Sequence, residues 1–325
     1  MEKKYYPEID ALKGWAIFIV ILVHSIIVYP INLHNNTYCK MLFDFGASFE
    51  MPLFFLISGF CFSYNNDYRF FISKKFKRIA IPYFVFFIFD MCLRCLIPSF
   101  VNKKRNLIDS IIGMFCGNTG PYWFLYCLFI IFAIYPFFFE IIKKTKNKSM
   151  SYSFLFMFFI LSCSNLKIEW LRLNSVALYL FWFALGQQLK CWWKFDEHKI
   201  TSISKRCFIV FLVLLLQLFL LFGIQYNHIL LEKFITCLGI VFSFLLVQFD
   251  GFKRFFEDFG KYSLQLYLFN GFFLTASRVL ICNYFHITNP IIIITSITMI
   301  CFFVSYFVIK YVCSKFKIMR AVMGM

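Results

Sequence analysis

The first apolar stretch of the chain, at residues 10–29, contains two ionisable residues that are not expected to face lipid. They are Lys13 and His24, eleven residues apart. In an α-helix this spacing makes three turns plus about 20°, so both side chains project from nearly the same face, roughly 16 Å apart along the axis. Because such groups are costly to bury in a bilayer, we expect them to face the protein interior and to mark a functional site.

His24 lies deep in this stretch, toward its outer half. Imidazole titrates near neutral pH, which suits a general base, but a histidine hydrogen-bonded between helices fits the position equally well. Lys13 lies at the expected cytoplasmic end, with Asp10 one turn before it. Its position alone favours a lysine whose ammonium group reaches the membrane boundary.

The elements that must position this pair are membrane helices. Of the 325 residues 61% are hydrophobic, the mean hydropathy is +0.75, and long apolar runs alternate with short basic segments. This pattern predicts an all-α polytopic membrane protein, a bundle of about ten transmembrane helices forming one domain over residues 1–325. The expected spans are residues 11–30, 43–64, 79–99, 121–142, 151–164, 173–190, 207–225, 229–249, 262–282 and 289–312, of which the fifth is the weakest.

The net charge of +17 is explained by topology. Most of the 33 Lys and Arg residues fall in the N-terminus and in every second loop. The positive-inside rule therefore predicts that both termini are cytoplasmic. We expect the protein to be a multi-pass protein of the inner (cytoplasmic) membrane of the cell. The aromatic residues lie in the spans, so no basic, aromatic-studded groove for nucleic acid is indicated. The remaining loops hold only Lys40, Lys103, Lys104, Arg105, Lys167 and Arg172.

Metal and disulfide chemistry are not indicated by the 13 cysteines. Most of them lie inside apolar runs, without a CxxC pair or a His-rich cluster, so we expect small core residues and no metal site.

The second span reads EMPLFFLISGF at residues 50–60 and adds further candidates. Glu50 is an acid at membrane depth, and Pro52 should kink or interrupt the helix. Ser58 precedes Gly59, and small residues of this kind usually allow another backbone to approach closely. Glu50 and Ser58 are therefore candidates for binding substrate, with close helix packing as the alternative for Ser58.

A basic segment, SKKFKRIAIP at residues 73–82, follows at the inner face. It is either a topology signal attracted to anionic lipid or a phosphate clamp for a nucleotide or coenzyme A, and its spacing does not choose between these. Its candidate donor-binding residues are Lys74, Lys75, Lys77 and Arg78.

Three residues of later spans could contact a substrate. Trp123, at the outer start of the fourth span, is either an interfacial belt residue or a surface on which a sugar stacks. Asn270 ends the segment GKYSLQLYLFN, and Arg278 is an intramembrane charge that needs a partner.

Taken together, these segments resemble integral-membrane acyltransferase family 3, and within it the fucose 4-O-acetylase-like branch. The resemblance is carried along almost the whole chain by DALKG with His24 eleven residues after Lys13, MPLFFLISGF at 51–60, KRIAIPY at 77–83, YWFL at 122–125 and GKYSLQLYL at 260–268. The basic residue and the histidine that follows it, together with MPLFFLISGF, are its more specific parts.

The resemblance implies transfer of an acyl group, usually acetyl from acetyl-CoA, to a hydroxyl of an extracytoplasmic or lipid-linked glycan such as a surface polysaccharide or O-antigen. It assigns His24 as the catalytic histidine and Lys13 as the matching basic residue. The chain departs from the pattern at Lys13, where the family more often has Arg, and at Glu50 and Asn270, where it often has His. Lysine keeps the charge of arginine but lacks its bidentate fork.

Two other classes of function remain open from the residues. A transporter or flippase of a lipid-linked sugar would use His24, Glu50 and Arg278 as pathway residues and would need no acyl-CoA. A non-catalytic membrane scaffold would leave the buried charges without a purpose. The resemblance to the acyltransferase family favours an acyl-CoA-dependent enzyme over both.

Overall fold

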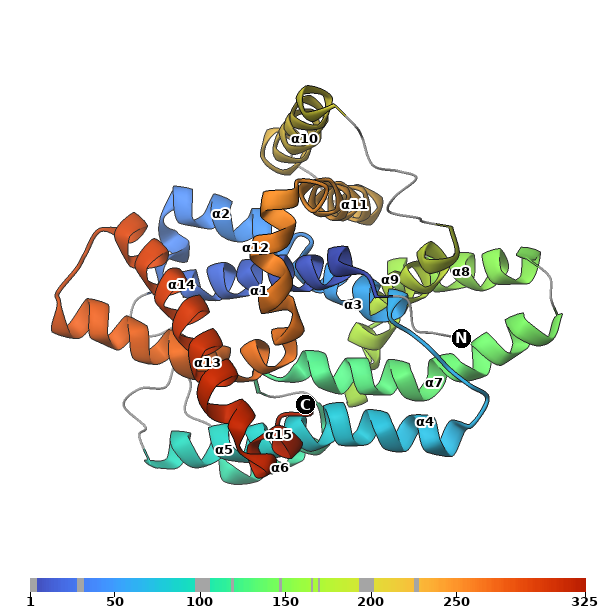
Figure 1. Ribbon diagram of the computed structural model, residues 1–325, viewed down its shortest axis with the longest axis horizontal. Coiled ribbons are helices and arrows are strands. Elements are labelled where there is room, and N and C mark those ends of the chain that lie inside the picture. The colour runs from blue at the N-terminus through green and yellow to red at the C-terminus, as the bar shows by residue number, and fades with distance from the viewer. Residues whose placement is uncertain are drawn as a thin grey trace. The chain divides into compact units, whose positions relative to one another are not determined.

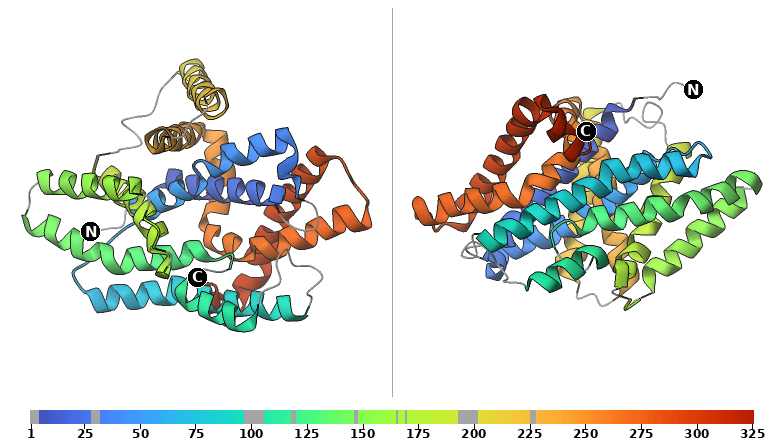
Figure 2. Two further views of the ribbon diagram at one scale, coloured as in Figure 1. Left: turned by 180° about the vertical axis from the view of Figure 1, so that it is seen from behind. Right: turned by 90° about the horizontal axis from the view of Figure 1, so that it is seen from below.

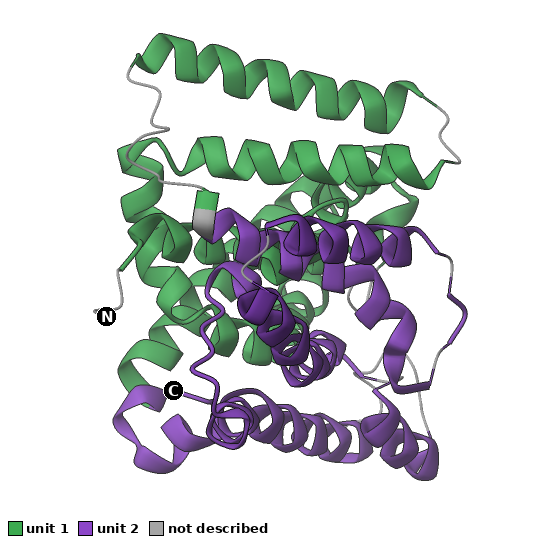
Figure 3. Cartoon of the chain, turned by 90° about the vertical axis from the view of Figure 1, so that its right-hand side faces the viewer, with its two compact units in different colours: residues 1–57, 192–312 green, residues 58–191, 313–325 purple. Residues whose placement is uncertain are grey.

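The computed structural model describes residues 5–27, 32–96, 106–117, 120–145, 148–164, 166–168, 170–192, 202–224 and 228–325. These residues form helices and no strand, so the predicted all-α class is confirmed. The chain divides into two compact units: residues 1–57 with 192–312 form the first, and residues 58–191 with 313–325 form the second (Figure 3). The predicted outer basic cluster at residues 103–105 lies outside the described residues.

The first unit is organised around α1 (Figure 1). It contains α1 (Pro7–Ile27), η1 (Leu33–Asn35), α2 (Thr37–Ala47), most of α3 (Glu50–Phe60), α10 (Ile203–Leu218), η5 (Phe219–Gly223), α11 (Ile229–Leu246), α12 (Asp250–Lys261), α13 (Ser263–Val279), η6 (Leu280–Tyr284), α14 (Pro290–Phe307) and η7 (Val308–Val312). Helix α1 packs against α2, α11, α12, α13 and α14, and α13 also packs against α14, which crosses it (Figure 2).

The second unit is built on a long helix that begins before the basic segment. Its elements are α4 (Tyr68–Lys75), η2 (Phe76–Ala80), α5 (Ile81–Leu96), α6 (Leu107–Cys116), α7 (Trp123–Thr145), α8 (Lys148–Cys163), η4 (Trp170–Arg172), nearly all of α9 (Leu173–Trp192), η8 (Cys313–Lys315) and α15 (Lys317–Val322). Helix α7 packs against α4, η2 and α8.

Eight of the ten expected spans are helices long and apolar enough to cross a membrane, within the part of the chain that the structure describes. The two others are α8, which is shorter, with 16 residues, and α9, which has 20 residues. Polar side chains of α9 pair inside the unit: Gln187 accepts a hydrogen bond from Tyr135, and Gln188 bonds Ser151. These buried amides make α9 less apolar than a span that faces lipid.

The boundaries of two spans differ from the prediction. The second span begins at Thr37 and is interrupted at residues 48–49, just before α3. Pro52 therefore lies in the first turn of α3, where a proline is tolerated, and the break expected from it comes a few residues earlier. The third was placed at residues 79–99, but the helix runs unbroken over Tyr68–Leu96. The cations assigned to a loop therefore lie on a helix, with a π-helical turn at Phe76–Ala80.

The segment between the eighth and ninth spans is also a helix, which the prediction had placed in a basic loop. Helix α12 is strongly amphipathic, with phenylalanines on one side and charges on the other. Phe252 and Phe256 both pack edge-on against Trp15 of α1. Since α12 has 12 residues and many charges, it anchors α1 without spanning the membrane.

The crossing of α1 and α12 is a direct contact between backbones. A Cβ on Gly14 would lie 2.1 Å from the Phe256 carbonyl oxygen, and one on Gly260 would lie 1.7 Å from the Asp10 carbonyl oxygen. No side chain fits in either place, so glycine at both positions sets the separation of the two helices.

Gly260→Ala should destabilise the first unit by at least about 1–3 kcal/mol, because the added methyl group forces the two backbones apart. Thermal unfolding of the purified protein in detergent measures the effect. Gly251→Ala, on the same helix, is the matched control, since nothing lies within 4 Å of its Cβ position. Equal unfolding midpoints for the two variants would contradict the crossing described here.

Candidate active site

His24 has a fixed hydrogen-bonding arrangement near the C-terminal end of α1. Its Nδ1 lies 2.8 Å from the Val20 carbonyl oxygen, one turn earlier. A carbonyl oxygen can only accept, so Nδ1 carries the proton and donates it. In the neutral ring Nε2 is then the atom with the free lone pair, and the half-buried side chain presents a base at this atom.

Lys13 lies on the same uninterrupted helix, so the predicted placement of the pair on one element is observed. Its Nζ is 2.8 Å from Asp10 Oδ1, and both side chains are partly buried, with 27% and 14% of their surface exposed. An ammonium group has three donors, and the bond to Asp10 uses one of them. The other two donors can bind an anion, which would compete with the Asp10 carboxylate for the ammonium group.

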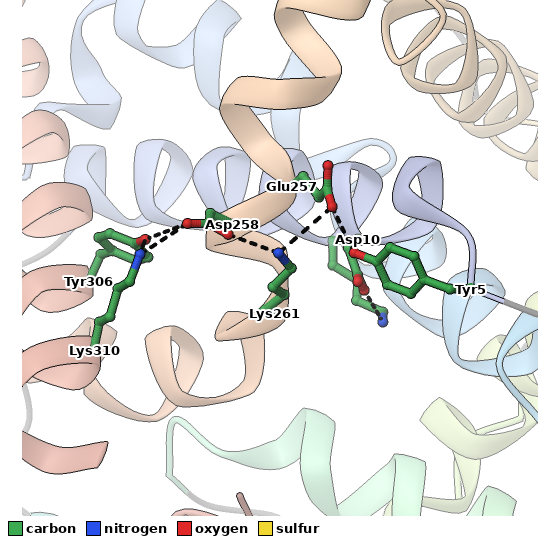
Figure 4. Close-up of polar contacts among 8 residues, drawn as sticks. Tyr5, Asp10, Glu257, Asp258, Lys261, Tyr306 and Lys310 are labelled. Carbon is green, nitrogen blue, oxygen red and sulfur yellow. Dashed lines mark hydrogen bonds and ion pairs between the residues drawn. The ribbon is translucent and has the colours of Figure 1, made fainter. Parts of the chain in front are cut away.

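Ion pairs of α12 surround the amino-terminal end of α1 (Figure 4). Tyr5 donates a hydrogen bond of 2.7 Å to Glu257, which lies 3.7 Å from the Lys261 ammonium group. Lys253 of α12 also pairs with Glu8 of α1, at 3.4 Å. These contacts attach the segment that carries Lys13 to α12.

Asp258 links α12 to the end of α14. It pairs with Lys261 at 2.9 Å and with Lys310 at 3.0 Å, and Tyr306 donates to it at 3.2 Å. The hydrogen bond from Lys261, followed by that from Lys310, lowers the pKa of the Asp258 carboxyl from 3.8 to about 2. The carboxylate is therefore charged throughout the ordinary pH range.

At the other end of α1, buried polar groups come from α13 and α14. Arg278 is fully buried, and its Nη2 lies 3.5 Å from the Ile26 carbonyl oxygen at the end of α1. Its Nε and Nη1 have no hydrogen-bond partner among the described residues. Thr298 donates to Ser25, next to His24. The partner of Arg278 on α1 is thus a helix-end carbonyl, which suits a cation through the helix dipole.

Glu50 and Asn270, the other two candidates in the first unit, are both buried. Glu50 begins α3, and its Oε2 has no hydrogen-bond partner within the described residues. Asn270 lies against Cys301 of α14, whose thiol is 3.8 Å from the Asn270 side-chain oxygen. Asn270 therefore contributes to the packing of α13 on α14, while Glu50 keeps unused hydrogen-bonding capacity.

The four cations of the predicted phosphate clamp point to different surroundings, because they lie on a helix. Lys74, Lys77 and Arg78 are exposed, whereas Lys75 is half-buried with its Nζ 3.7 Å from the ring centroid of Phe132. Such a cation–π contact occupies the Lys75 ammonium group. Three of the four predicted donor-binding cations are therefore accessible.

Trp123 and Ser58 also belong to the second unit. Arg172 stacks on the Trp123 ring at 5.1 Å and donates a 2.6 Å hydrogen bond to the Gly117 carbonyl oxygen, and Tyr179 lies 5.7 Å from the same ring. Ser58 precedes Gly59, where a Cβ would lie 1.8 Å from the Phe183 carbonyl oxygen, so this pair mainly serves the contact of α3 with α9.

The charged face of α12 and the contacts of Arg172 were not predicted from the sequence. The charges of DGFKRFFEDFGK repeat with helical spacing opposite its phenylalanines, a signal that was available in the sequence. Arg172 lies in a connection with φ near +50°, which no spacing rule predicts. Among the described residues, no group of three or more His, Cys, Asp and Glu side chains could hold a metal ion.

Comparison with known proteins assigns the class. The family model described as an acyltransferase domain, that of acyltransferase family 3, matches residues 6–310. The chain therefore belongs to this family, and it is a multi-pass membrane acyltransferase. No curated protein and no solved structure matches the chain.

The Asp258 ion pairs predict a pH-dependent contribution to stability. Because the pKa of Asp258 is lowered, its stabilisation is complete above the ordinary pKa of about 4 and disappears as the pH falls toward 2. Asp258→Asn should therefore lower the unfolding midpoint at pH 6, with a smaller difference from wild type at pH 3. Asp109→Asn is the control, since Asp109 is exposed and forms no ion pair with any described residue. A difference that stays constant with pH would exclude this role for Asp258.

Proposed function

We propose that this acyltransferase moves an acetyl group from cytoplasmic acetyl-CoA to a hydroxyl of an extracytoplasmic or lipid-linked glycan, as a member of the fucose 4-O-acetylase-like branch, in the cytoplasmic membrane. The observation that carries the proposal is that one buried helix of an acyltransferase holds both Lys13 and a His24 whose Nε2 is free to accept a proton.

In the proposed reaction His24 acts as the general base. Its Nε2 takes the proton of the acceptor hydroxyl as the oxygen attacks the thioester carbonyl carbon. The carbon–sulfur bond then breaks, and the proton passes from the imidazolium to the departing thiolate, giving an O-acetylated glycan and free coenzyme A. The bond from Nδ1 to the Val20 carbonyl keeps the ring oriented and stabilises the imidazolium.

Lys13 is proposed to guide the donor from the cytoplasmic side. The rise of an α-helix places it about 16 Å from His24 along the axis, which suits a donor that enters at one membrane face and an acceptor presented at the other. Lys74, Lys77 and Arg78 are exposed cations suited to the phosphates of coenzyme A.

Trp123, with Arg172 and Tyr179 beside it, supports a carbohydrate acceptor. An aromatic face packs against the apolar side of a sugar ring, while a guanidinium group donates to its hydroxyls or to a linked phosphate. Glu50, Asn270 and Arg278 are proposed as further polar contacts to the acceptor, with Ser58 as a weaker candidate.

His24→Ala should lower acetyl transfer by about 10²–10⁴-fold, because a positioned general base contributes roughly that factor. Mass spectrometry and NMR of the surface polysaccharide measure it in a deletion strain complemented with each variant. Loss of acetyl groups on deletion, restored by wild type and by His228→Ala but not by His24→Ala, is the expected result; His228 is exposed at the start of α11.

Wild-type acetylation in the His24→Ala strain, at equal protein level, would overturn the assigned base. An unchanged glycan mass with less glycan at the surface would instead favour transport of a lipid-linked sugar.

Lys13→Arg should keep most of the activity, whereas Lys13→Met should lose most of it, because the positive charge is the property that a phosphate or thioester oxygen recognises. The dependence of the transfer rate on acetyl-CoA concentration, measured in membranes, should show a higher apparent KM for Lys13→Met. Equal activity of Lys13→Arg and Lys13→Met would show that the positive charge of Lys13 does not contribute to donor binding.

A further inference from the structure

The C-terminal helix α15 returns to the basic segment of the second unit. Gly324 ends this helix with φ of +69°, and a Cβ there would lie 2.3 Å from the Arg78 carbonyl oxygen. Met323, the residue before it, is 1% exposed. The end of the chain is thus packed directly on the backbone of Arg78.

Arg320 is held at this junction by the helix turn that precedes Gly324. The Met325 amide donates to the Arg320 carbonyl oxygen at 2.9 Å. Adding standard bond lengths along this path puts the Cα atoms of Arg78 and Arg320 no more than about 14 Å apart. Both side chains are exposed, and an extended arginine reaches about 6 Å from its Cα, so the separation is short enough for two arginines that turn toward one another to share an anion.

Carboxylate side chains are absent from the sequence around these cations. Residues 68–89 and 311–325 contain no Asp or Glu. Within the described part of the chain, no ion pair involves Lys74, Lys77, Arg78, Lys317 or Arg320. The lysines of α12 differ, because Lys253 and Lys261 each have carboxylate partners. Cations that repel one another and form no ion pair with a described carboxylate side chain favour an anionic ligand.

We propose that Arg320 of α15 and Arg78 bind the same phosphate group, and that this group belongs to the coenzyme A donor. The identity of the ligand rests on the proposed acetyl-CoA dependence; the pairing of the two arginines does not. Two planar guanidinium forks can each donate to different oxygens of one phosphate, whereas the isolated lysines act as point charges. An anionic lipid headgroup offers the same chemistry.

Binding of coenzyme A to the full-length protein in phosphatidylcholine nanodiscs tests the proposal. Arg320→Gln and Arg78→Gln should each raise the dissociation constant about tenfold, as expected for loss of a charge-assisted hydrogen bond. In the double variant the dissociation constant should rise by less than the product of the two single-variant factors, because a shared phosphate makes the effects non-additive. Arg254→Gln, at an exposed arginine of α12, should leave it unchanged.

Gly324→Ala tests the position of Arg320 without changing any charge, since the added methyl group should push α15 away from Arg78. It should weaken coenzyme A binding as Arg320→Gln does, with the unfolding midpoint confirming that each variant is folded. The pairing would be overturned if wild type binds coenzyme A tightly and both Arg320→Gln and Gly324→Ala bind it equally well. It would also be overturned if the increases in dissociation constant caused by Arg78→Gln and Arg320→Gln multiply in the double variant.

A second arm of the experiment distinguishes the source of the phosphate. If wild type does not bind coenzyme A, binding of phosphatidylglycerol vesicles to the detergent-solubilised protein is compared for the same variants. Weaker vesicle binding by both arginine variants would support the shared phosphate site with a lipid ligand and would refute the coenzyme A donor. Vesicle binding equal to wild type would refute the shared site as well.

Discussion

The backbone contact between α1 and α12 is the constraint on which the candidate site depends. Gly14 and Gly260 let the two helices meet without intervening side chains. This contact brings the phenylalanines of α12 onto Trp15 and places its charged face around the end of α1 that carries Lys13. A rigid α1 in turn fixes the axial separation of Lys13 and His24, since one helix has a constant rise per residue.

Polar groups in the first unit fall into two kinds. Those at the α12 end are paired with one another, as Asp258 is with Lys261, and their net effect is to join helices. Those deeper in the unit, Arg278 and Glu50, retain polar atoms without partners among the described residues. An unsatisfied buried polar group is destabilising, so these two residues support the proposal of polar contacts to the acceptor.

Much of the fold and of the site could be predicted from residue pattern. The apolar runs predicted the helices, and the spacing of Lys13 and His24 on one helix is observed. The start of the third span was placed too late because its first turns are basic, and charge was taken as the signal for a loop. The helix α12 was missed because a search for spans counts mean hydropathy, whereas α12 is amphipathic.

The sequence by itself determined the helical membrane class, the order of the spans and the placement of Lys13 and His24 on one helix, because these follow from composition and from the fixed geometry of one helix. Only the tertiary structure decided which nitrogen of His24 is free, that Lys75 is engaged by Phe132, and that Gly324 attaches the C-terminal helix to Arg78. Those outcomes depend on contacts and on side-chain geometry, which residue order alone does not specify.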